Sequence, residues 1–260
     1  MSSWLLLYII VLALASSSTA YTISDCSALV SFYQAMTVNT KWTTSTGWVT
    51  TDDCCSWYGV TCSYSTRNGT GFGPWVSALQ LPNNQLSGYL PSSFSLLSRL
   101  ERLDLSHNKV KGDISVLLQM KASSVCIDTA TSQIPDTVFE SACNSDLNCL
   151  GGVCSVVGGL KEIRLSDNML NGTIGEEISN LFKTLTILDL SANELTGPIP
   201  AMIGTLTQLV ELNLYYNQLR LSNSSGPIPE MIGMLVKLKY LNVAFNLLNG
   251  TLPSQNLPPV

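Results

Sequence analysis

Apolar and polar positions alternate in a short segment that returns along most of the chain. Its first copy, over residues 79–91, reads Leu-x-Leu-x-x-Asn-x-Leu-x-Gly-x-Leu-Pro. Later copies keep the same register, and their asparagines mark the period: Asn84, Asn108, Asn168, Asn193, Asn217 and Asn246. The ordinary step between them is about 24 residues, which is the length of one small supersecondary unit.

This pattern predicts a coil that is stacked on copies of itself. The Leu-x-Leu pair has the period of a strand, so its leucines point inward and neighbouring strands pair in parallel along a concave face. The asparagine amide turns inward and satisfies buried backbone groups, while the glycine tolerates the angles of the next bend. Apolar residues at steps of three fill the convex side. No single coil can bury its own apolar face, so the copies must stack.

The longest step in the period, between Asn108 and Asn168, contains an interruption. Within it, residues 125–127 followed by Ile-Pro at 134–135 predict a shortened, degenerate repeat. Residues 143–154 predict a loop stapled by disulfides. Such an island could contribute to ligand binding or could be a tolerated surface insertion, and the residues leave both alternatives open. For its cysteines we expect the pairs Cys126–Cys143 and Cys149–Cys154.

A cysteine-rich segment precedes the repeats, and the two together resemble a known family. Residues 52–62 read Asp-Asp-Cys-Cys-Ser-Trp-Tyr-Gly-Val-Thr-Cys, and the fullest repeat, Leu-x-x-Leu-x-Leu-x-x-Asn-x-Leu-x-Gly-x-Ile-Pro, begins at Leu185. This combination is similar to plant-type leucine-rich-repeat proteins, which include polygalacturonase-inhibiting proteins and the ectodomains of receptor-like proteins and kinases. The resemblance covers about residues 25–253.

That resemblance implies an α/β solenoid. It would be a right-handed leucine-rich-repeat superhelix with a parallel concave β-sheet and a disulfide-bonded N-terminal cap. It also implies that the first four cysteines pair as Cys26–Cys54 and Cys55–Cys62. The apolar side of residues 27–36, with Trp42, Trp48 and Trp57, is expected to cover the open end of the first coil.

The N-terminus and the sequons indicate secretion. Residues 4–15 are apolar but too short to span a bilayer comfortably, and small residues precede a plausible signal cleavage after Ala20. A buried N-terminal helix is the alternative. The even number of cysteines, 8, fits an oxidising compartment. Expected glycosylation sites are Asn68, Asn171, Asn223 and Asn249. We therefore expect a secreted, extracellular protein of the cell wall or cell surface, with no membrane span once the signal is removed.

These observations divide the chain into six segments. We expect a signal peptide, a cap, repeats, a degenerate repeat with the cysteine-containing island, further repeats and a short tail. Their bounds are 1–20, 21–75, 76–119, 120–159, 160–253 and 254–260. Because the tail resembles no capping segment, the last coil is expected to expose part of its apolar edge. The tail or a partner would then cover that edge, or the chain is a truncated product.

Charge and candidate chemistry argue for binding over catalysis. With a net charge of −5 and only 12% charged residues, the chain offers no basic face for nucleic acid, and a polyanion such as pectin is also disfavoured. We interpret the single histidine, His107, as a solvated turn residue. The carboxylate pairs at 52–53 and 176–177 read as solvated charges. A zinc site in the first cysteine group is the alternative to its disulfides. We expect no enzyme, no cofactor and no metal.

The outward positions of the predicted strands give the candidate ligand-binding site. On the concave face they are Asp104, Arg164, Asp189, Asn213, Tyr215, Tyr216, Tyr240, Asn242 and Phe245. The aromatic members gather on the last two strands, where exposed rings suit peptide or glycan recognition. An ordinary surface, or packing against a cap, is the alternative.

The leading functional hypothesis is an extracellular recognition protein, in defence or receptor signalling. It would bind an extracellular protein, a peptide or a glycan through its concave face, with a membrane receptor kinase as a further candidate partner. The alternatives are an inhibitor of a secreted wall-degrading hydrolase, of the polygalacturonase-inhibitor type, a structural wall component, and a truncated ectodomain of a receptor-like kinase.

Overall fold

A computed structural model describes most of the chain. The described residues are 20–37, 41–65, 72–120, 123–128, 148–149, 152–157, 159–181, 183–220 and 228–248. The expected signal segment before Ala20, the short tail, Cys143 and three of the four candidate glycosylation sites lie outside them. The fourth site, Asn171, is exposed.

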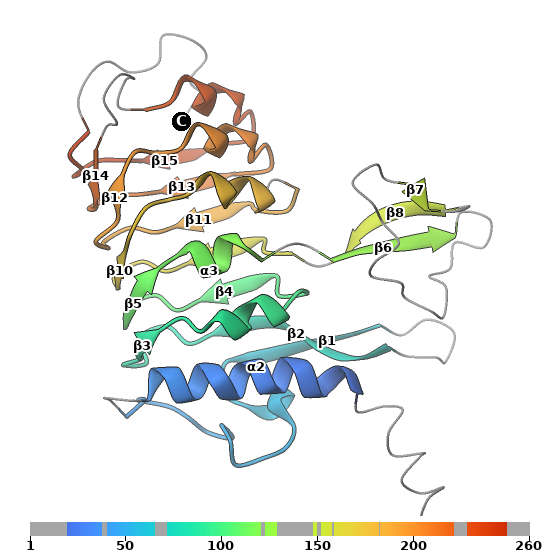
Figure 1. Cartoon of the computed structure of the whole chain (residues 1–260). Coiled ribbons are helices and arrows are strands. Elements are labelled where there is room, and N and C mark those ends of the chain that lie inside the picture. Colours follow the sequence, from blue (N-terminus) through green and yellow to red (C-terminus); the bar gives the residue numbers. More distant parts are fainter. Residues whose placement is uncertain are drawn as a thin grey trace, which may run out of the picture.

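The repeats form one solenoid whose concave face is a seven-stranded sheet (Figure 1). Its strands, in spatial order, are β1 (Val60–Ser65), β2 (Phe72–Gln80), β4 (Arg102–Asp104), β9 (Glu162–Arg164), β11 (Ile187–Asp189), β13 (Glu211–Asn213) and β15 (Tyr240–Asn242). The β1 strand is antiparallel to β2, and every later pair is parallel. The expected right-handed α/β solenoid with a parallel concave sheet is therefore present, with one antiparallel strand added at its capped end.

The register of the sheet follows the apolar pattern. Leu79 pairs with Leu103, Leu103 with Ile163, and the same inward position continues through Leu188 and Leu212. Because strand side chains alternate, a slip by one residue would turn every one of these apolar side chains to solvent. The register is thus set by burial.

The other sides of the coil are built from short elements. After each bend come the small sheet strands β3 (Ser87–Tyr89), β5 (Lys109–Asp113), β10 (Met169–Asn171), β12 (Thr196–Gly197) and β14 (Gln218–Leu219). The convex side carries α3 (Ser115–Leu118) and the 3-10 helices η2 (Ser92–Leu96), η3 (Glu176–Leu181), η4 (Ala201–Thr205) and η5 (Glu230–Met234). Three of these helices begin directly after a proline, which fixes an extended entry into the turn.

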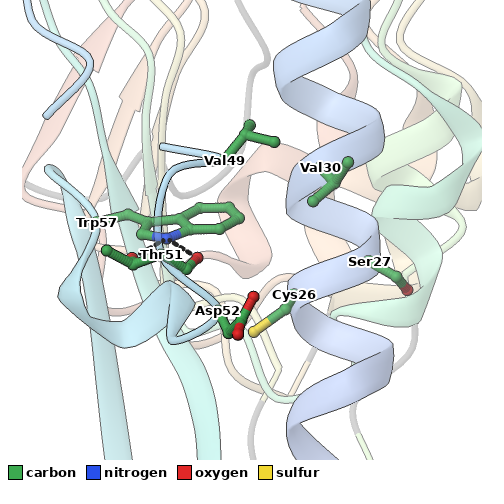
Figure 2. Close-up of a pocket in the computed structure, with 7 residues that line it drawn as sticks. All are labelled: Cys26, Ser27, Val30, Val49, Thr51, Asp52 and Trp57. Atoms are coloured by element: carbon green, nitrogen blue, oxygen red, sulfur yellow. Dashed lines mark hydrogen bonds between the residues drawn. The ribbon is translucent and has the colours of Figure 1, made fainter. Parts of the chain in front are cut away.

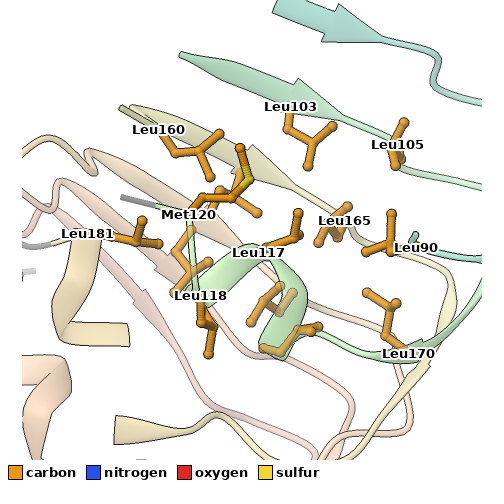
Figure 3. Close-up of a cluster of buried hydrophobic side chains, with 14 of the residues drawn as sticks. Leu90, Leu103, Leu105, Leu117, Leu118, Met120, Leu160, Leu165, Leu170 and Leu181 are labelled. Atoms are coloured by element: carbon orange, nitrogen blue, oxygen red, sulfur yellow. The ribbon is translucent and has the colours of Figure 1, made fainter. Parts of the chain in front are cut away.

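Leucine side chains from the strands and the convex helices fill the interior (Figure 3). In the middle of the stack, Leu103, Leu105 and Leu165 from the concave side meet Leu117 from α3 and Leu170 from β10, and all five are buried. Each buried leucine stabilises the fold by about 1.5–3 kcal/mol. Every coil depends on its two neighbours for this burial, which is why the apolar pattern has to continue along the stack.

The asparagine ladder is present as expected. Asn108 accepts hydrogen bonds at Oδ1 from the backbone nitrogens of Asn84 (3.0 Å) and Leu86 (2.9 Å). Its Nδ2 donates to the carbonyl oxygens of Leu81 and Leu105, both at 2.9 Å. Bonds of the same kind recur at the later ladder positions. The buried amide therefore forms hydrogen bonds with backbone groups for which the bend itself offers no partner.

The cap covers the first coil with a helix and a cluster of aromatic rings. Helix α2 (Ala20–Met36) lies across the end of the stack (Figure 1), and its Phe32 is in ring contact with Trp42, Trp48 and Phe94. Around η1 (Cys54–Ser56) the structure forms the disulfides Cys26–Cys54 and Cys55–Cys62, the two pairs that the resemblance implies.

The described strands of the interruption form a separate sheet beside the main one, which corrects one expectation. The β6 strand (Ser123–Asp128) pairs antiparallel with β8 (Gly152–Val157), and β8 pairs with β7 (Asn148–Cys149). In the main sheet, β4 pairs directly with β9. Residues 125–127 are therefore not a repeat strand. The reason is visible in the sequence, since Ala130 stands where a ladder asparagine would be needed.

Candidate ligand-binding face

The polar residue that ends each of four concave strands accepts hydrogen bonds from the turn that follows it. Asp104 accepts hydrogen bonds at Oδ1 from the backbone nitrogen (3.0 Å) and the hydroxyl (2.7 Å) of Ser106. Asp189 makes the same two bonds to Ser191, at 3.0 and 2.6 Å. One oxygen of each carboxylate is thus engaged in closing the turn after its strand.

Asn213 and Asn242 repeat this arrangement on the last two strands. The Oδ1 atom of Asn213 accepts from the Tyr215 nitrogen (3.2 Å), and that of Asn242 from the Ala244 nitrogen (3.1 Å). Sequence reasoning placed all four of these residues in the ligand site, but it missed this local role. Only the spacing of two residues between the Asp/Asn and the next turn residue could have signalled it.

Charged side chains on the concave face are paired with one another. Lys161 bonds Glu101 at 2.9 Å, and Arg164 on β9 lies 3.7 Å from Glu211 on β13, two strands away in the sheet. His107 Nδ1 lies 3.0 Å from Asp167 Oδ2. Exposed pairs of this kind stabilise by only about 0–1 kcal/mol. Arg164, a predicted ligand contact, is therefore held in place but remains only partly buried.

Six residues directly before the ladder asparagines form a continuous edge, which we call the rim. They are Asn83, His107, Asp167, Ala192, Tyr216 and Phe245, and all have a left-handed backbone with φ between 50° and 56°. Asn, Asp and His are common in this conformation, whereas bulky side chains are rare there. The first three members fit the backbone preference, and the two aromatic members do not.

The rim ends in a cluster of rings that we call the aromatic platform: Tyr215, Tyr216 and Phe245. Ring centroids are 5.1 Å apart between Tyr215 and Phe245, 6.0 Å between the two tyrosines and 6.4 Å between Tyr216 and Phe245. Tyr216 is 59% exposed and Phe245 is 69% exposed. The expected clustering of aromatic residues on the last two repeats is thus present for these three.

Tyr240, the fourth aromatic candidate, lies apart from the platform. Its hydroxyl oxygen accepts a hydrogen bond from Asn242 Nδ2 at 3.1 Å, and its side chain is exposed on β15. Within the described part of the chain it makes no ring contact with the platform. We therefore treat it as a neighbour of the platform.

Two clefts lie elsewhere on the molecule. A polar cleft of about 660 Å³ runs along the first half of the rim, between the His107–Asp167 pair and the side chains of Lys109 and Met169. A smaller cleft of about 290 Å³ lies in the cap (Figure 2), where Val30 of α2 and Val49 stand on opposite sides of it. Sequence reasoning found neither cleft, because both depend on segments that are distant along the chain.

The candidate metal-ligating side chains of the described residues do not gather at one place. No group of three or more His, Cys, Asp or Glu side chains among them is placed to hold a metal ion. The carboxylates of Glu176 and Glu177 are exposed on the convex η3 helix. In the same part of the chain, no helix is long and apolar enough to cross a membrane.

A capped stack of parallel-stranded coils with a buried asparagine ladder is the architecture of a leucine-rich-repeat protein. Family models agree: the leucine rich repeat N-terminal domain matches residues 23–63, and the leucine rich repeat matches 99–120, 159–181 and 184–206. The chain therefore has the leucine-rich-repeat fold, and its repeats are similar to the plant-type pattern.

Its relatives are plant receptor-like proteins. Receptor-like protein 39 of Arabidopsis thaliana is 34% identical over 130 residues, which is 50% of this chain and 14% of that protein. The chain thus spans about a seventh of that relative's length. Among solved structures, the ectodomain of the Arabidopsis receptor kinase GASSHO1/SCHENGEN3, in complex with CASPARIAN STRIP INTEGRITY FACTOR 2, matches with a TM-score of 0.55 and 27% identity. That match covers 88% of this chain and 25% of the ectodomain.

The ectodomain of the Arabidopsis receptor kinase SOBIR1 has the same fold. Its TM-score is also 0.55, at 23% identity, over 86% of this chain and 92% of that ectodomain.

Proposed function

We propose that the protein works outside the cell as a recognition module. It binds an extracellular protein, peptide or glycan through its concave face and the adjoining rim. The secretory features of the sequence, the cap disulfides and the similarity to receptor-like proteins support the extracellular location. Binding by the similar ectodomain GASSHO1/SCHENGEN3 supports a role in recognition.

One observation carries the proposal: Tyr216 and Phe245 combine exposure with an unfavourable backbone. A left-handed conformation costs a residue with a Cβ atom about 1–2 kcal/mol. Exposed rings recover little of this cost through burial. Positions that break a local preference without a gain in packing are typical of functional sites. Asn83, His107 and Asp167 show that the same turn accepts residues that suit the backbone better.

The neighbouring backbone holds these two residues rigidly. The Tyr216 nitrogen donates to the Ala244 carbonyl oxygen at 3.0 Å, and the Asn217 nitrogen donates to the Phe245 carbonyl oxygen at 3.2 Å. The platform is therefore fixed before a ligand arrives. Fixed groups lose less conformational entropy on binding, so a rigid platform favours affinity.

Affinity capture with the purified mature chain tests the proposal. Extracellular fluid is passed over immobilised wild type, over the double variant Tyr216→Ser/Phe245→Ser, and over Tyr89→Ser. Tyr89 is a matched control because it is an exposed tyrosine on β3, away from the platform. We expect a ligand that wild type and Tyr89→Ser retain and that the double variant loses. Equal retention by all three would refute recognition at this face.

A further inference from the structure

We infer that the aromatic platform binds a neutral β-linked oligosaccharide, with sugar rings lying against the faces of Tyr216 and Phe245. This inference rests on the proposed function and specifies the ligand class for the same face. Three observations lead to it: the low number of charges around the platform, its unpaired polar groups, and the spacing of its rings.

Charge is distributed unevenly along the concave face. The strands and turns at 101–108 and 161–168 carry most of it, in the pairs described above. The equivalent segments at 210–217 and 239–246, which hold the platform, contain two charged residues, the exposed Lys239 and Glu211. That carboxylate faces Arg164 at 3.7 Å. An ionic ligand would find its partners at the other end of the face, so the platform favours an uncharged one.

Uncharged hydrogen-bonding groups around the rings have no partner within the described part of the chain. They are the hydroxyls of Tyr215 and Tyr216, the Nδ2 of Asn213 and the side-chain amide of Gln218. Together they offer both donors and acceptors. Sugar hydroxyls also donate and accept, so a sugar can satisfy this mixed set without bringing a charge.

The rings lie in a row that the solenoid itself sets. Tyr216 and Phe245 occupy the same rim position in successive repeats, and their centroids are 6.4 Å apart. Successive strands of the stack lie about 4.8 Å apart. These spacings are comparable to the step between successive rings of an extended β-linked glucan. The C–H face of each pyranose ring can then rest on the electron-rich face of one aromatic ring.

A peptide fits the platform less well. Peptide recognition usually places anchor side chains in pockets. The two clefts described above contain no platform residue. Tyr216 and Phe245 are open rings tilted by 44° to each other. They provide shallow contact and shallow hydrogen bonding, which successive rings of a twisted sugar chain use more fully.

Titration with defined sugars tests the inference. Cellohexaose, chitohexaose and laminarihexaose are the neutral probes, and hexagalacturonic acid is the charged counterpart. Binding is measured by calorimetry and by saturation transfer to the sugar protons. We expect at least one neutral hexamer to bind, Tyr216→Ala and Phe245→Ala each to weaken it by tenfold or more, and hexagalacturonic acid to bind more weakly.

Two further variants separate binding from folding. Tyr89→Ala removes an exposed tyrosine on β3, away from the platform and the rim, so it should leave sugar affinity unchanged. Tyr216→Asn suits the left-handed backbone and should keep or raise the melting temperature while losing sugar affinity. Loss of affinity in a variant that melts no lower than wild type would support direct contact.

Other outcomes would overturn the inference. No binding of any neutral hexamer at millimolar concentration, or binding of hexagalacturonic acid alone, would reject it. If the capture experiment then yields a protein or peptide that depends on the platform, the proposed function survives and only the ligand class is wrong. If the double variant Tyr216→Ser/Phe245→Ser captures the same molecules as wild type, the proposed function is rejected as well.

Discussion

Asn84 holds Thr44 by both ends of its side-chain amide. Oδ1 accepts from the Thr44 nitrogen at 2.7 Å, and Nδ2 donates to the Thr44 carbonyl oxygen at 2.9 Å. The backbone nitrogen of Asn84 donates to Asn108 Oδ1 at 3.0 Å. The first ladder residue thus connects the cap to the repeats by the bonds that connect one repeat to the next.

Replacement of Asn84 should therefore loosen the capped end. We expect Asn84→Ala to lower the free energy of unfolding by about 2–4 kcal/mol, because Asn84 is buried and the substitution strands the backbone groups of Thr44. Urea denaturation followed by circular dichroism measures the change. Asn171→Ala, at an exposed position of β10, is the control and should shift stability by less than about 0.5 kcal/mol. Similar losses in the two variants would argue against the ladder's role.

Gly204 marks the closest packing of two convex turns. A Cβ atom at this position would collide with the Met231 carbonyl oxygen and lie 2.7 Å from Met231 Cβ. We expect Gly204→Ala to destabilise by about 1–3 kcal/mol through overpacking. Thermal melting measures it. The control is Gly175→Ala, whose new methyl would meet only the flexible carboxylate of Glu177. A melting temperature of Gly204→Ala equal to that of the control would contradict the packing.

Val49 is a strained residue at the edge of the cap cleft. It has φ of 58° and is 50% exposed. A β-branched residue rarely adopts this conformation, and asparagine adopts it far more readily. We expect Val49→Asn to stabilise the protein by about 0.5–1 kcal/mol. The neighbouring Thr50→Asn, also exposed, should be neutral in the same denaturation series. Destabilisation by Val49→Asn would mean that packing outweighs strain.

The pairing of strands β6 and β8 leads us to predict a disulfide that differs from those expected from the sequence. Cys126 and Cys154 are direct partners in the antiparallel register of β6 and β8. Such partners have Cα atoms about 4.5–5.5 Å apart, within the range for a disulfide. We therefore predict Cys126–Cys154, which leaves Cys143 to pair with Cys149. Peptide mapping of the unreduced protein decides between this and the pairs Cys126–Cys143 and Cys149–Cys154, and either of the latter would reject it.

Features that repeat along the chain could be predicted from the sequence alone. The inward leucines and the ladder asparagines could be placed because each copy faces the same position in the next copy, so a local pattern determines a long-range contact. The same rule located the aromatic residues in the last two repeats, although Tyr215, Tyr216 and Phe245 lie in the turns after β13 and β15 and not on the strands. It could not reveal that Asp104 closes its own strand, because an outward strand position and a turn-closing side chain share one pattern.

Features that occur only once in the chain could not be predicted from the repeating sequence pattern. Val125 and Ile127 have the alternation of a strand, but alternation does not say which sheet a strand joins. The left-handed rim was also missed, because Tyr216 and Phe245 are residues that argue against that backbone. Their placement follows from the hydrogen bonds of neighbouring repeats, which override local preference.

Because β4 pairs directly with β9, the main sheet forms its hydrogen bonds without the intervening hairpin. Met120 and Leu160, which flank the excursion, are both buried in the same apolar cluster (Figure 3), so the chain leaves the core and re-enters it at neighbouring points. Each doubling of a loop's length costs only about 0.6 kcal/mol in closure entropy. We therefore expect insertions of different length and sequence to be tolerated between Met120 and Leu160. The strand register of the solenoid on either side would stay the same.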